Sequence, residues 1–145
     1  GLILGAAVGM GFAALESNGY AFVAFLESNG NLSTTVGVTL LRGLLSPLGH
    51  GTWTAILASV LFRESKDCCF KINLQVIGAY LFVSLLHTVW NVLPLLTAPE
   101  NPGLSVFITE GVVGAIGLWV LWLRWKEAVR LQIVALPQEV RTYET

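Results

Sequence analysis

The sequence predicts an all-α membrane protein, a bundle of four transmembrane helices, because charge is scarce and long apolar stretches recur. Of the 145 residues, 54% are hydrophobic and only 12% are charged, whereas roughly a quarter of the residues in soluble domains are charged. The mean hydropathy is +0.72. A membrane span needs about 20 apolar residues, so four spans and short loops account for the length. A net charge of −1 and only two cysteines argue against nucleic-acid binding and against a disulfide scaffold.

Four apolar stretches are expected to cross the membrane as one domain, residues 1–123, followed by a C-terminal tail, residues 124–145. The expected spans cover about residues 2–26, 36–62, 72–96 and 104–123. The first lacks a basic start and is too long for a signal peptide. In the second, Pro47 cannot donate to the Gly43 carbonyl and therefore breaks the helical hydrogen bonding. The fourth ends in three tryptophans, which are typical of a membrane interface: Trp119, Trp122 and Trp125.

The positions of the basic residues predict the orientation in the membrane. Seven of the eight Lys and Arg residues lie in the loop 63–71 or in the tail after residue 123, and the eighth is Arg42. Because basic loops stay on the cytoplasmic side, we expect this loop and the C-terminus to be cytosolic. Cys68 and Cys69 in the loop are then expected to stay reduced, with palmitoylation as the alternative.

Five ionisable side chains lie inside the spans, where each costs a few kcal/mol and needs a reason. Three of them fall at one depth, about 18–23 Å from the inner boundary at 1.5 Å per residue: Glu16, His50 and His87. The other two, Arg42 and Glu110, each lie about six residues from the outer end of a span. Their matched depth predicts a structural ion pair, and a substrate-binding role for Arg42 is the alternative.

Helical spacing places the three residues of common depth on packing faces. In the third span, polar residues recur at helical spacing on one side: Tyr80, Ser84, His87 and Asn91. In the second span Ser46, His50 and Thr54 form a shorter stripe. In the first span, small residues share a face that reaches Glu16, so a neighbouring helix is expected to pack there: Gly5, Gly9 and Ala13. Glu110 likewise begins a face of small residues that runs through Gly114 and Gly117.

One carboxylate and two imidazoles at one depth predict a zinc site. Zinc accepts nitrogen and oxygen ligands and keeps a fourth position open for water in catalytic sites. The ligands would be Glu16, His50 and His87. Asn91, one turn beyond His87, could orient a ligand or donate to an oxyanion. These four residues are therefore the predicted catalytic set.

Three segments with recognisable motifs follow one another along the chain. The first runs from Phe12 to Glu16, the second carries Arg42, Pro47 and His50, and the third joins His87 to Asn91. Their pattern is Phe-x-x-x-Glu, a histidine after an Arg and Pro segment, and His-x-x-x-Asn or Asp. In this pattern the chain resembles the PrsW family of intramembrane metalloproteases, which belongs with the CAAX-processing and bacteriocin-processing membrane proteases. The resemblance implies zinc-dependent hydrolysis of peptide bonds in membrane-associated substrates, such as an anti-sigma factor, in a bacterial or archaeal cell membrane.

The family pattern also has an earlier helix with the motif Glu-Glu-x-x-Lys, whose glutamates activate water. This chain has no adjacent pair of glutamates. We expect the motif to lie upstream of Gly1.

Two other functions are compatible with the residues. His50 and His87, on neighbouring helices at one depth, would suit bis-histidine ligation of haem b. That hypothesis gives no role to Glu16. A non-catalytic membrane scaffold with the same fold is the second alternative.

Overall fold

A computed structural model describes residues 1–65, 69–97 and 102–135 and confirms the predicted all-α fold. Its elements are α1 (Leu2–Glu27), α2 (Leu32–Leu45), the π-helix η1 (Pro47–Gly51), α3 (Thr52–Glu64), α4 (Leu74–Thr97) and α5 (Pro102–Ala135). By length and composition, four helical segments can cross a membrane, with α2, η1 and α3 together forming the second. The chain is therefore an integral membrane protein.

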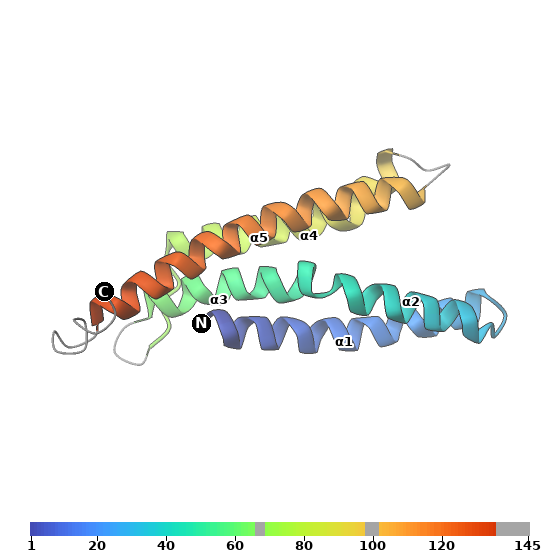
Figure 1. Cartoon of the computed structure of the whole chain (residues 1–145), viewed down its shortest axis with the longest axis horizontal. Coiled ribbons are helices and arrows are strands. Elements are labelled where there is room, and N and C mark those ends of the chain that lie inside the picture. The colour runs from blue at the N-terminus through green and yellow to red at the C-terminus, as the bar shows by residue number, and fades with distance from the viewer. Residues whose placement is uncertain (66–68, 98–101, 136–145) are drawn as a thin grey trace.

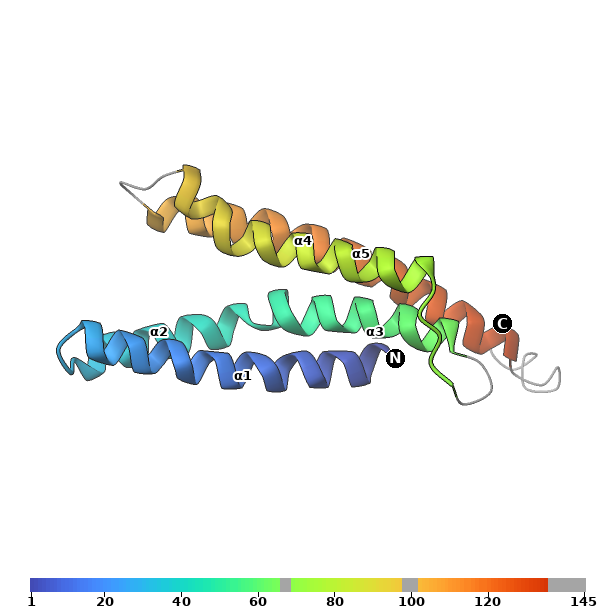
Figure 2. The ribbon, with the colours of Figure 1, turned by 180° about the vertical axis from the view of Figure 1, so that it is seen from behind.

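The spans pack as two groups, which Figures 1 and 2 show from opposite sides. α1 lies along α2, η1 and α3, and α4 lies along α5. The second group meets the first mainly through α3, and the two diverge toward the end where α1 turns into α2. α3 is thus the central element of the bundle.

The second span is broken at Pro47, as its sequence predicts. The break takes the form of one wide turn, in which the Gly51 N–H donates to the Ser46 carbonyl at 3.4 Å. The Thr52 hydroxyl also donates to the Pro47 carbonyl at 2.7 Å. Such π-turns are frequent at functional sites, and this one carries His50.

Two helix ends differ from the expected span limits by more than two residues. α2 begins at Leu32 because Asn31 caps it, its side chain accepting from the Ser33 and Thr34 N–H groups at 2.9 and 3.3 Å. α5 continues without a break to Ala135, so the first part of the expected tail is helical. Residues 136–145 lie outside the described part of the chain.

Small residues allow close approach of the helices, as expected. Gly5, Gly9 and Ala13 are buried on α1. A Cβ at Gly5 would lie 2.5 Å from the Ala58 Cβ, and one at Gly9 would lie 2.2 Å from the His50 carbonyl oxygen. The backbone of α1 therefore touches η1 and α3 directly.

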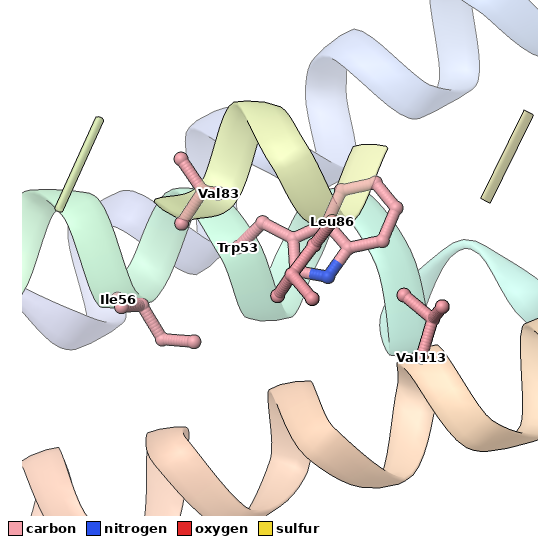
Figure 3. Close-up of a cluster of buried hydrophobic side chains, with 5 residues drawn as sticks. All are labelled: Trp53, Ile56, Val83, Leu86 and Val113. Carbon is pink, nitrogen blue, oxygen red and sulfur yellow. The ribbon is translucent and has the colours of Figure 1, made fainter. Parts of the chain in front are cut away.

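The apolar core lies between α3, α4 and α5. Figure 3 shows its buried members: Trp53, Ile56, Val83, Leu86 and Val113. Most other large apolar side chains are exposed on the surface of the bundle, as expected where lipid replaces water around a protein. Trp53 thus belongs both to the core and, through its position three residues after His50, to the neighbourhood of the predicted site.

Charged residues at the opposite end of the bundle from the α1–α2 turn form a network that links three helices. Arg63 donates to Glu127 of α5 at 2.8 Å and to Gln75 of α4 at 2.9 Å. Arg124 also pairs with Glu127 and donates to the Ser59 hydroxyl at 3.0 Å. Basic residues that predict orientation therefore also hold helices together. In the adjoining loop Cys69 is exposed, and Cys68 lies outside the described residues.

Candidate metal centre

The structure brings together the three residues that the sequence places at one depth. Glu16 comes from the middle of α1, His50 from η1 and His87 from α4. Each offers one ligand atom, and these atoms all lie within 4.8 Å of one another. Three segments that are far apart in the sequence thus converge on one point.

The two histidine rings lie next to each other. Their ring centroids lie 5.0 Å apart with an interplanar angle of 80°. His50 Nε2 lies 3.7 Å from Glu16 Oε2, is buried and has no hydrogen-bond partner among the described residues. Buried polar atoms nearly always have a partner, so an unpaired imidazole nitrogen that faces a carboxylate and a second imidazole fits a position for a cation.

The local sequence explains how His50 reaches this position. The π-turn Pro47–Gly51 is wider than an α-helical turn, so it rotates the side chains of the second span relative to those of α2 just before α3 begins. Gly9 then allows the His50 backbone to touch α1, because no Cβ intervenes. The same face of α1 continues through Ala13 toward Glu16. This packing therefore also sets the position of the Glu16 carboxylate along the bundle axis relative to His50.

Aromatic side chains surround the histidines. Phe12 lies 5.2 Å from the His50 ring, and Trp53 lies 5.6 Å from His50 and 5.3 Å from His87. Trp90 packs edge-on against Trp53. Phe12 is part of the Phe-x-x-x-Glu segment, whereas the sequence analysis assigned no site role to either tryptophan. Their positions three residues after His50 and three after His87 are the signal that could have identified them.

Arg42 has a different partner from the one expected. It forms an ion pair with Glu16 and donates from Nε to the Ser17 hydroxyl at 3.3 Å. Glu110 Oε2 is buried, and no residue in the described part of the chain forms a hydrogen bond to it. Among the described residues Arg42 therefore pairs directly with Glu16 in place of the expected Glu110: α2 packs along α1, and the long arginine side chain carries its charge to the depth of Glu16.

A cavity of about 220 Å³ lies beside the centre. Glu16 and His50 line it on one side, and Trp90, Asn91 and Glu110 contribute from α4 and α5. His87 touches His50 and Trp53 without lining this cavity. Asn91, expected to assist the centre, therefore shares a cavity with two of the three candidate ligands.

Comparison with known proteins identifies a family that uses a metal ion, as the arrangement of these side chains suggests. Residues 1–124 match the family model described as PrsW family intramembrane metalloprotease. No curated protein and no solved structure matches the chain. The match covers all three candidate ligands and most of the chain, and the chain therefore belongs to the PrsW family of intramembrane metalloproteases.

Proposed function

We propose that this protein is a zinc-dependent intramembrane protease that cleaves membrane-associated protein substrates, with an anti-sigma-factor-like protein as one example. The observation that carries the proposal is the convergence of Glu16, His50 and His87 within 4.8 Å at membrane depth. Membership of the family supports peptide-bond hydrolysis as the reaction.

The donor set fits zinc in chemistry and in size. Tetrahedral zinc at about 2.0–2.2 Å from its ligands keeps those ligand atoms about 3.3–3.6 Å apart. Glu16 Oε2 and His50 Nε2, at 3.7 Å, are already near that separation. The third ligand atom, from His87, lies within 4.8 Å of the others and needs only a small movement.

Each residue then has a chemical role. Zinc in this position would supply a Lewis acid that polarises the peptide carbonyl and activates water. Glu16, His50 and His87 would hold the ion, and Asn91 would donate a hydrogen bond to the carbonyl oxygen as it gains negative charge. Water adds to the carbonyl carbon, the C–N bond breaks and the amine leaves with a proton. The family pattern assigns acceptance of the water proton to a pair of adjacent glutamates, which residues 1–145 do not contain.

Haem ligation has less support. The cavity of about 220 Å³ is smaller than the roughly 300–1,000 Å³ of typical small-molecule and cofactor pockets. Trp53 also packs within 5.6 Å of both imidazole rings. No contact among the described residues favours a haem over a metal ion.

Proteolysis is tested with the full-length gene product in membranes and a membrane-anchored reporter substrate. Glu16→Gln and His87→Ala are each expected to lower cleavage by at least 100-fold, because ligands to the metal would be lost. Glu27→Gln is the matched control, since Glu27 begins the same tetrapeptide, Glu-Ser-Asn-Gly, at the exposed end of α1. Cleavage by Glu16→Gln at the rate of the control would refute the proposal.

A further inference from the structure

The Arg42 guanidinium is held by three side chains on one face of α1. It pairs with Glu16, donates to Ser17 and lies 3.8 Å from the centroid of the Tyr20 ring. These residues stand at positions i, i+1 and i+4 of the helix and so surround one point on its surface. On α2, the Arg42 carbonyl also accepts a hydrogen bond from the Ser46 hydroxyl at 2.6 Å.

This arrangement determines where the Glu16 carboxylate points. The oxygen that Arg42 holds, Oε2, is also the atom that lies 3.7 Å from His50 Nε2. A glutamate side chain has several rotatable bonds, and a fixed guanidinium removes that freedom. The contact with Arg42 therefore restricts the Glu16 carboxylate to a position that faces His50.

Holding Glu16 in this way leaves room for a metal ion. An ionised carboxylate has about four acceptor positions on its two oxygens, so one guanidinium N–H leaves others open. Carboxylates that bind metals in proteins are commonly hydrogen-bonded by a second group, and loss of that group typically weakens metal affinity by 10–100-fold.

We propose that Arg42 is the positioning residue for Glu16, fixing the carboxylate as a metal ligand by means of Ser17 and Tyr20. The inference rests on the metal centre of the proposed function. Arg42 does not touch the metal in this scheme, and its charge also offsets that of Glu16 in the apolar surroundings of the bundle.

Zinc affinity of the purified protein in detergent tests this role without any activity assay, by competition with a chromophoric chelator. Arg42→Gln is expected to weaken zinc binding by about 10–100-fold and to change the visible absorption of the cobalt-substituted protein. Arg42→Lys keeps the positive charge but loses the planar guanidinium with its several N–H donors. This variant is expected to recover only part of the zinc affinity. Arg130→Gln, at an exposed arginine of α5, is the matched control and should bind zinc as the wild type does.

Several results would overturn the inference. Unchanged affinity in Arg42→Gln would show that Glu16 needs no positioning, and tighter binding would show that Arg42 competes with the metal. A wild-type protein that fails to bind zinc would overturn the proposed metal centre as well. If Arg42→Gln does not fold, Ser17→Ala and Tyr20→Leu decide the matter: weaker zinc binding in both supports the role, and wild-type affinity in both refutes it.

Discussion

Substitution of Gly9 by alanine tests whether close helix packing places the metal ligands. A Cβ at this position would lie 2.2 Å from the His50 carbonyl oxygen, 2.7 Å from the His50 carbonyl carbon and 2.9 Å from the Thr54 Cβ. A comfortable carbon–oxygen contact is about 3.3 Å. Two of these neighbours are backbone atoms and cannot rotate away, so α1 must move away from η1 by about 1 Å.

Two measurable losses follow from this movement. Overpacking of this kind costs about 1–3 kcal/mol in the free energy of unfolding. The separation of Glu16 from His50, now 3.7 Å between Oε2 and Nε2, would grow by a similar distance. We expect zinc affinity to fall by at least tenfold, which corresponds to about 1.4 kcal/mol.

Gly11→Ala is the matched control, because a Cβ at Gly11 meets no atom of the described ranges 1–65, 69–97 and 102–135 within 4 Å. Thermal unfolding in detergent and zinc competition should both give wild-type values for this variant, or slightly higher stability because alanine favours helix. If Gly9→Ala retained both stability and zinc affinity, the packing of α1 on η1 would not be what positions Glu16.

Four further perturbations test other parts of the structure. Glu110→Gln should leave stability unchanged or raised, because no described residue forms a hydrogen bond to the buried Glu110 Oε2; a loss of about 3–5 kcal/mol in thermal unfolding would instead indicate a buried ion pair. Glu127→Gln should lower the free energy of unfolding by about 1 kcal/mol, since it breaks contacts to both Arg63 and Arg124, and an unchanged melting temperature would contradict this. In a Cys68→Ser background, an impermeant maleimide should label Cys69, which is exposed, in inside-out vesicles; labelling only in intact cells would reverse the predicted orientation. Chelation of zinc should lower apparent stability, by about 2.7 kcal/mol if zinc had been present at 100 times its Kd, and identical melting with and without chelator would argue against a metal centre.

The spans and the packing faces could be predicted from the sequence because they depend on local patterns. Apolar stretches of sufficient length identify the helices, and the buried small residues on α1 match the predicted face. The depth of Glu16, His50 and His87 along their spans also predicted their convergence. Distance along a helix is nearly fixed by residue number, which is why depth can be counted from the sequence.

The partner of Arg42 could not be predicted from depth, because a long side chain carries its charge away from the level of its own backbone.

The position at which α1 ends also could not be predicted from its local sequence alone. Glu-Ser-Asn-Gly occurs twice, and the copy beginning at Glu16 lies inside α1 whereas the copy beginning at Glu27 ends it. The second copy turns with φ of 55° at Asn29 and 85° at Gly30. Apolar residues that extend the span follow the first copy, and polar residues follow the second, so the surroundings decide the outcome.

The metal content of the purified protein tests the central claim most directly. After loading with zinc and extensive dialysis, the wild type and Gly11→Ala are expected to retain about one zinc ion per chain. His50→Ala and His87→Ala are each expected to lose it, because two ligands do not hold zinc in place. Equal zinc content in all four proteins would contradict a centre built from Glu16, His50 and His87.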